Sequence, residues 1–122
     1  MGTESARTKK EKKTFYEAID KAEGFRCCRY LNEEDGPCCV IGQLAFIEKI
    51  PVDTIFSWGN QSISHPSIRC NKLSEKYSIR LLRDIQKIWD GFSMFDIPAA
   101  STEKEARAKM KEKVTEYYSV CI

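Results

Sequence analysis

Six cysteines carry the most obvious chemistry in this chain of 122 residues. Four of them form two adjacent pairs, Cys27-Cys28 and Cys38-Cys39, with nine residues between the pairs, so a turn there would bring four thiols together. Structural zinc sites favour Cys-x2–4-Cys knuckles, a spacing that is absent here. We therefore expect these side chains to act as small buried hydrophobes, with no cofactor. A zinc-stabilised domain is the alternative, with candidate ligands Cys27, Cys28, Cys38 and Cys39.

A cysteine nucleophile is the second kind of chemistry to consider. Cys38 or Cys39 stands at the predicted start of a helix, where the helix dipole lowers the pKa of a thiol. The single histidine, His65, would be the general base that such a thiol needs. Nothing in the sequence brings His65 close to either cysteine. We therefore expect a protein that is not an enzyme, and keep a cysteine-dependent enzyme using Cys38 or Cys39 as the alternative.

A basic helix face is the strongest candidate binding surface. Four bases recur at helical spacing on one face, with apolar residues on the opposite face. We call this set the cationic ridge: Lys76, Arg80, Arg83 and Lys87. Like charges at i,i+4 cost about 0.2–0.5 kcal/mol per pair in an isolated helix, so the ridge is either a solvated face or a site for an anionic partner. Two bases just before it extend the candidate binding residues, namely Arg69 and Lys72.

The chemistry of the ridge limits the class of partner. A phosphate-bearing ligand or an acidic protein surface fits it. A nucleic-acid-binding domain stays an alternative but is not favoured, because the net charge is only +2 and no nucleic-acid-binding motif is present. No apolar run approaches the ~20 residues of a membrane span, so we expect no membrane partner. The N-terminus does not resemble a signal peptide, so we expect reduced thiols and a cytoplasmic protein. The oligomeric state is left open, a homo-oligomer included.

Two predicted elements precede the cysteine pairs and follow from charge and capping signals. Residues 1–13 are rich in lysine and are expected to be a flexible basic leader. Thr14 and Glu17 then form a capping box that starts a helix ending near Gly24. Thr8 and Glu11 form a second box, which would start the helix earlier.

The remaining elements follow from periodicity and turn chemistry. An extended run at 25–31 and an acidic turn at 32–37 lead into a buried helix at 38–47, in which Gly42 implies close backbone packing. A helical turn at 51–58, a polar loop at 59–71, an amphipathic helix from Lys76 to about Asp90 and a capped helix from Ser101 or Thr102 complete the chain. The apolar stripe expected on the last helix is Ala106, Met110, Val114, Tyr117 and Cys121. The prediction is an α-dominated fold, a compact bundle of about four main helices with a small β-hairpin or short extended element, and a single globular domain over 14–122.

The segment Cys38–Ala45 resembles a group of small, mostly uncharacterised phage and bacterial proteins. Those proteins carry a Cys-Cys-Leu-Gly-type signature that opens a helix, and the dipeptide Trp89-Asp90 resembles their later helix end. The similarity spans roughly residues 25–118, although Gln43 and Ala45 depart from the signature. The resemblance implies a phage or mobile-element origin and a host or defence component as the target. We therefore expect a non-catalytic, inhibitor-like binding protein that acts through surface contacts, the cationic ridge included.

Overall fold

The fold is all-α in the computed structural model, which describes residues 6–27, 29–59, 61–68, 70–92 and 99–120. Four longer helices and two short ones occur in these ranges, and the four longer helices confirm the predicted architecture. In chain order they are α1 (Ala6–Lys21), α2 (Val40–Ile47), α3 (Val52–Ser57), α4 (Lys72–Lys76), α5 (Ile79–Trp89) and α6 (Glu103–Val120). No helix in the described ranges has the length and apolar character needed to cross a membrane.

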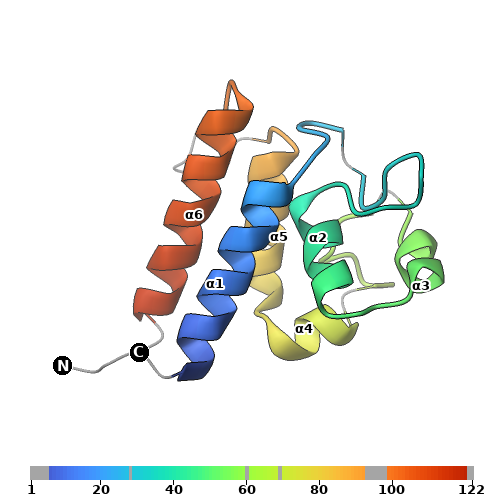
Figure 1. The fold of residues 1–122 in the computed structure, drawn as a ribbon, viewed down its shortest axis with the longest axis horizontal. Coiled ribbons are helices and arrows are strands. Elements are labelled where there is room, and N and C mark those ends of the chain that lie inside the picture. Colours follow the sequence, from blue (N-terminus) through green and yellow to red (C-terminus); the bar gives the residue numbers. More distant parts are fainter. Residues whose placement is uncertain (1–5, 28, 60, 69, 93–98, 121–122) are drawn as a thin grey trace.

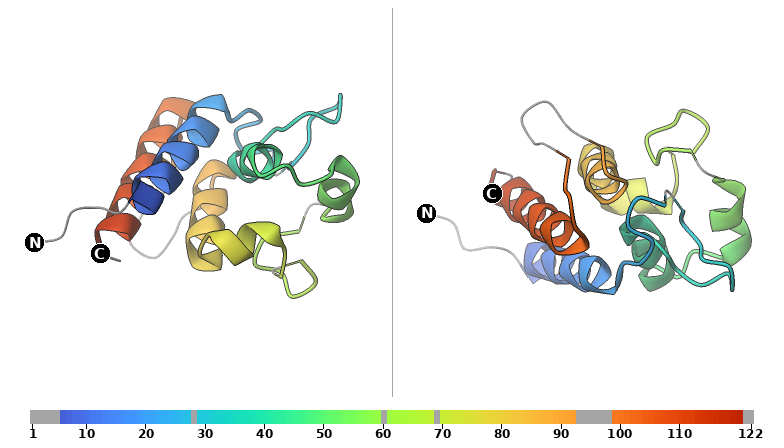
Figure 2. Two further views of the ribbon diagram at one scale, coloured as in Figure 1. Left: turned by 60° about the horizontal axis from the view of Figure 1, so that its bottom comes forward. Right: turned by 90° about the horizontal axis from the view of Figure 1, so that it is seen from above.

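Helix α1 lies between α6 and α2 and packs against both. Helix α5 packs against both α6 and α2, so that four helices enclose one core. Helix α3 lies at the far side of the molecule from α6 in all three views (Figures 1 and 2). Consequently α3 is the element with the least cover from the rest of the bundle.

Helix α1 begins at Ala6, eight residues before the predicted start at Thr14. The prediction of a flexible leader is therefore wrong for residues 6–13. The Thr14 hydroxyl donates to the carbonyl of Lys10 within the helix, 2.9 Å away, and does not cap its end. Glu11 holds the early turns against the bundle, because it is only 8% exposed and accepts a hydrogen bond from the Tyr118 hydroxyl of α6 at 3.2 Å.

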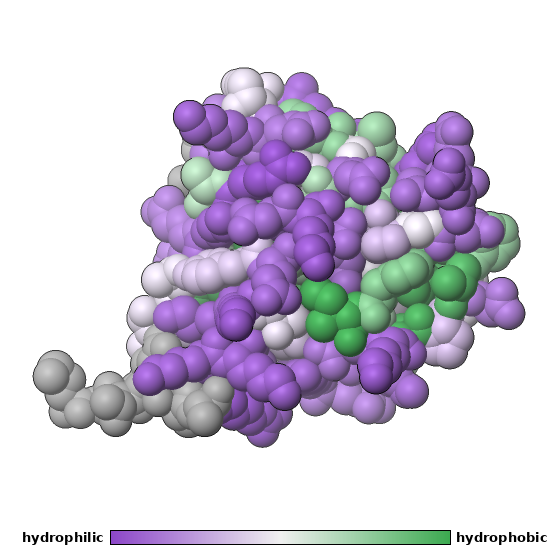
Figure 3. Space-filling view, viewed as in Figure 1, coloured by the Kyte–Doolittle hydropathy of each residue, from purple (hydrophilic) through white to green (hydrophobic). Residues whose placement is uncertain are grey.

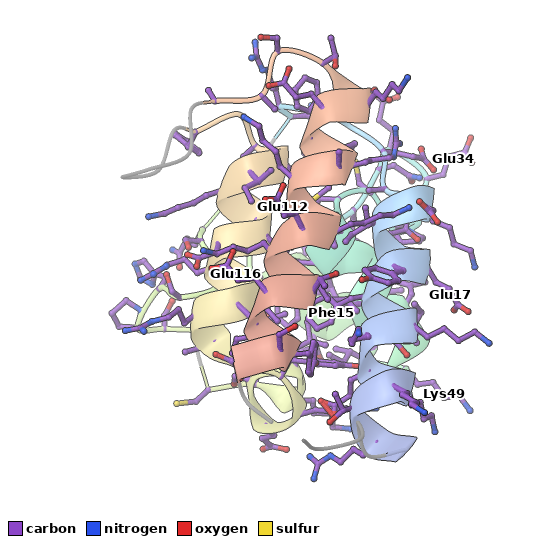
Figure 4. The ribbon with its side chains drawn as sticks, turned by 90° about the vertical axis from the view of Figure 1, so that its left-hand side faces the viewer. Phe15, Glu17, Glu34, Lys49, Glu112 and Glu116 are labelled. Atoms are coloured by element: carbon purple, nitrogen blue, oxygen red, sulfur yellow. The ribbon has the colours of Figure 1, made fainter. Side chains whose placement is uncertain are left out.

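Aromatic rings and an apolar stripe on α6 fill the core between α1 and α6. Phe15 is fully buried, and its ring meets Tyr77 edge-on at 4.9 Å between centroids. Its side chain points into the space between α1 and α6 (Figure 4). Tyr118 completes the α6 stripe at 6% exposure, in place of the predicted Tyr117, which is half-buried. Three predicted members of the stripe are fully buried, namely Ala106, Met110 and Val114, whereas Cys121 lies outside the described residues.

Helix α2 passes directly against the backbone of the segment before it. A Cβ atom on Gly42 would overlap the carbonyl oxygen of Tyr30, which confirms the predicted close approach. The same carbonyl accepts the Cys38 amide at 3.0 Å, and an isolated antiparallel bridge pairs Leu31 with Pro37. This bridge corresponds to the predicted short extended element.

The predicted helix from Lys76 to Asp90 is two helices. Helix α4 ends at Lys76, Tyr77 adopts an extended conformation, and Ser78 caps α5 by accepting the amide of Leu81 at 3.4 Å. The end of α5 is as predicted, with Gly91 at a φ of +85° just after it. The break removes Lys76 from the helix that carries the rest of the cationic ridge.

Candidate functional site

The two cysteines at the start of α2 face different surroundings. Cys39 is the N-cap residue, and its sulfur accepts the amide of Gly42 at 3.5 Å. Cys38 lies against Gly24, at a point where a side chain on that glycine would also meet Cys27. The adjacent thiols therefore lie against different parts of the fold, as expected for packing residues.

Burial opposes the activation of these thiols. Desolvation raises the pKa of Cys39 to about 12, despite the amide of Gly42 that favours the thiolate. Burial, followed by the charge of Glu23, also raises the pKa of Cys38 above its ordinary value. The helix start does occur at Cys39 as predicted, but the thiol pKa moves in the direction opposite to that required for a nucleophile.

His65 is an exposed residue of the loop between α3 and α4. Its Nδ1 atom lies 2.8 Å from the Ser67 hydroxyl and 3.1 Å from the Ser67 amide, so the ring stabilises its own turn. No group of three or more His, Cys, Asp or Glu side chains able to hold a metal ion occurs among the described residues. Of the four candidate zinc ligands, Cys28 lies outside them.

The structure separates the members of the cationic ridge. Lys76 of α4 forms an ion pair with Glu48 at 3.0 Å, and Arg83 forms one with Asp84 at 3.2 Å. Arg80 and Lys87 are exposed and have no ion-pair partner among the described residues. Of the two upstream candidates, Lys72 is exposed at the start of α4 and Arg69 lies outside the described residues.

Acidic side chains also flank the α5 part of the ridge. Glu112 and Glu116 project from α6 on its α5 side (Figure 4). Arg80 and Glu116 line a common hollow of about 180 Å³ with Lys113, and Lys113 lies 4.0 Å from Asp84. This face therefore alternates in charge, which weakens the prediction of a purely cationic surface.

An apolar surface that the sequence analysis did not single out lies at the edge formed by α2 and α3. We call it the apolar edge, and define it as Ile47, Val52 and Phe56, which are 37%, 36% and 72% exposed. Apolar side chains gather over α2 and α3 in the space-filling view, whereas α1 and α6 are largely hydrophilic there (Figure 3). Val52 and Phe56 are four residues apart and share one face of a short helix, but the sequence alone does not show whether that face is exposed.

Helix α3 is anchored in the core through Ile55 and through Trp58 just after its end. Ile55 and Trp58 are buried, at 1% and 3% exposure, and the Trp58 ring meets Tyr30 edge-on at 5.3 Å. The side chain of Gln86 on α5 donates to the Tyr30 hydroxyl at 2.8 Å and accepts the amide of Ile63 at 2.8 Å. Because Ile55 and Trp58 are buried in the core, the orientation of α3 leaves Phe56 exposed.

A pocket of about 390 Å³ adjoins the apolar edge, between α3 and the turn that precedes α2. We call it the α3 pocket. Its lining is apolar on the α3 side and charged on the turn side, and comprises Arg29, Tyr30, Leu31, Asn32, Glu33, Asp35, Ile55, Phe56 and Gly59. Pocket and edge share Phe56, so together they form one continuous surface.

No protein-family model matches the chain, and no curated protein or solved structure matches it either. The described residues define a small all-α protein whose most distinctive surface is the apolar edge with the α3 pocket. The resemblance of Cys38–Ala45 to small phage and bacterial proteins stays a prediction.

Proposed function

We propose that this chain is a non-catalytic binding protein that docks a partner protein on its apolar edge. The observation that carries the proposal is the exposure of Phe56 and Val52 on a helix that the buried Ile55 and Trp58 anchor in the core. Exposed apolar side chains grouped on one surface are typical of sites where another molecule binds. The host or defence component implied by the resemblance is the partner class that we propose.

The size of the surface suggests that Phe56 is the principal contact. Fully burying a phenylalanine side chain contributes about 1.5–3 kcal/mol, and 72% of Phe56 is available to a partner. Covering that part would contribute about 1–2 kcal/mol, which corresponds to roughly a 5- to 30-fold change in Kd. Aromatic side chains at the centre of an interface are also those most often found to dominate its affinity.

Affinity capture from bacterial lysate with matched variants tests the proposal. Phe56→Ser removes the central side chain of the apolar edge, whereas Phe92→Ser removes another exposed phenylalanine, 57% accessible, after the end of α5. We expect a partner that is captured by the wild-type protein, depleted by Phe56→Ser and retained by Phe92→Ser. A partner retained equally by both variants would contradict docking at the apolar edge.

The α5 part of the cationic ridge is the second candidate surface, because Arg80 and Lys87 have no ion-pair partner among the residues that the structure describes. The double variant Arg80→Glu/Lys87→Glu belongs in the same capture experiment. Loss of the partner in this variant, with full retention in Phe56→Ser, would move the binding site to α5. Thermal unfolding of each variant checks that the loss of binding is not a loss of fold.

A further inference from the structure

The α3 pocket combines an apolar floor with an acidic rim. Leu31, Ile55 and Phe56 contribute the apolar part of its lining. The turn before α2 contributes Glu33 and Asp35 to the lining, together with one base, Arg29, and the exposed Glu34 lies between the two acids in the chain. None of these three acids has an ion-pair partner among the described residues, so their charge is available to a ligand.

Backbone hydrogen bonds hold the acidic rim in place. The Asn32 side-chain oxygen accepts the amides of Glu34 and Gly36, both at 2.9 Å, and the Asn32 amide donates to the Gly36 carbonyl at 2.8 Å. The Leu31–Pro37 bridge closes the base of the turn. The backbone that carries the carboxylates is therefore an ordered turn, and the fold places this turn beside Phe56 in the pocket lining.

The pocket is large enough for side chains of a partner. Its volume of about 390 Å³ exceeds the ~150 Å³ of a cavity that holds a benzene ring, so one aromatic or long aliphatic side chain fits with room for its neighbours. The segment 29–36 carries three acids against one base, Arg29, which favours a ligand of opposite charge.

We propose that the α3 pocket binds a segment of a partner protein in which an apolar side chain is flanked by lysine or arginine. The apolar side chain enters against Leu31 and Phe56, and the flanking bases meet Glu33 and Asp35 at the rim. This inference rests on the proposed function and adds the chemistry of the partner to it. Helix α1 of a second copy is a poorer occupant, because α1 carries exposed lysines but its large apolar side chains, Phe15 and Ile19, are fully buried.

Titration of the full chain with three synthetic 12-residue peptides tests the inference. The first peptide places one tryptophan between two pairs of lysines, the second replaces the lysines by glutamates, and the third replaces the tryptophan by serine. Fluorescence anisotropy at low and at high salt gives the affinities. We expect the first peptide to bind at least about tenfold more tightly than the second at low salt, and salt to reduce this preference.

Matched charge variants then show which acidic residues cause the preference for the lysine peptide. Glu33→Gln/Asp35→Asn removes two charges from the rim, and Glu17→Gln/Glu112→Gln removes two from exposed positions on α1 and α6 (Figure 4). We expect the rim variant to abolish most of the preference for lysine and the control variant to keep it. A preference that survives the rim variant overturns the inference, as does the absence of any peptide binding.

The outcomes separate this inference from the proposed function. Peptide binding that needs the tryptophan and Phe56, but shows no preference for lysine, overturns the inference and leaves docking at the apolar edge intact. Binding that is indifferent to Phe56→Ser contradicts both. Sedimentation velocity over the same concentrations completes the test by showing whether the protein forms dimers. Dimers that form through Phe56 and exclude the peptide would identify a second copy as the occupant and overturn the inference.

Discussion

The substitution Gly42→Ala tests the packing of α2 against the segment that carries the α3 pocket. In an ordinary helix interior, alanine is more favourable than glycine by about 1 kcal/mol. At Gly42 the added Cβ atom would overlap the Tyr30 carbonyl oxygen, which also accepts the amide of Cys38 at 3.0 Å. The substitution must therefore displace a hydrogen-bonded backbone, and we expect it to destabilise the protein despite the better helix propensity.

The magnitude follows from two costs and one gain. Overpacking a close contact costs about 1–3 kcal/mol, and the loss of the hydrogen bond to Tyr30 costs about 1–3 kcal/mol more. Subtracting the gain in helix propensity leaves a net loss of about 1–5 kcal/mol in the free energy of unfolding. A loss in the middle of this range is a large fraction of the ~5–15 kcal/mol that stabilises a typical domain.

Urea denaturation followed by circular dichroism measures the effect, with Gly59→Ala as the control. Gly59 has a φ of +60°, and a Cβ atom added to it would meet none of the described neighbours within 4 Å, so its substitution adds only backbone strain of about 1–2 kcal/mol. Restriction of the unfolded chain offsets about 0.4–1 kcal/mol of that strain. We expect Gly42→Ala to lose more stability than Gly59→Ala. A Gly42→Ala protein as stable as the wild type, or more so, would refute the close approach.

Three further predictions concern thiol reactivity, pH and helix capping. Iodoacetamide labelling at neutral pH, mapped by mass spectrometry, should modify the exposed Cys70 rapidly and leave Cys39 unreacted, because burial raises the pKa of Cys39 to about 12; faster labelling of Cys39 would revive the cysteine-enzyme alternative. Burial alone would raise the pKa of Glu48, but hydrogen bonds from Tyr77 (2.7 Å) and Lys76 lower it below its ordinary value. The stabilisation from this lowered pKa is complete above the unfolded-state value and is lost as pH falls through the folded-state value. The Tyr77→Phe variant should accordingly lose about 1–2 kcal/mol at neutral pH and less near pH 3, and a pH-independent loss in urea titrations would contradict the assignment. Arg107→Met should cost about 1–3 kcal/mol, because the guanidinium donates to carbonyls at the end of α1 at 3.2 and 2.8 Å; an unchanged Tm would show that these bonds contribute little.

Helices with a locally encoded apolar face were predictable from the sequence. The buried side of α5, including Leu82 and Ile85, follows from helical periodicity alone. For α1 the sequence offered an earlier start only as an alternative, through the box of Thr8 and Glu11. The contact that favours it joins Glu11 to Tyr118, 107 residues away, and no local pattern reveals it. The break at Tyr77 likewise depends on a long-range contact, the hydrogen bond to Glu48.

The cationic ridge and the apolar edge also differ in how far the sequence alone could predict them. Periodicity correctly placed Arg80 and Lys87 on an exposed face, but the acids of α6 that flank this face come from a distant part of the sequence. The exposure of Val52 and Phe56 depends on which side of α3 faces the body of the molecule, and that choice is made by the burial of Ile55. A helix of six residues has too few turns for its pattern to decide this in advance.

Amide hydrogen–deuterium exchange of the full chain, with and without the lysine–tryptophan peptide, tests the central claim most directly. Docking on the apolar edge and the α3 pocket predicts that the peptide slows exchange in residues 31–36 and in α3 (Val52–Ser57), with little change in α5 (Ile79–Trp89). Slower exchange confined to α5, with α3 and the acidic turn unchanged, would contradict the claim and place the bound peptide on α5 instead.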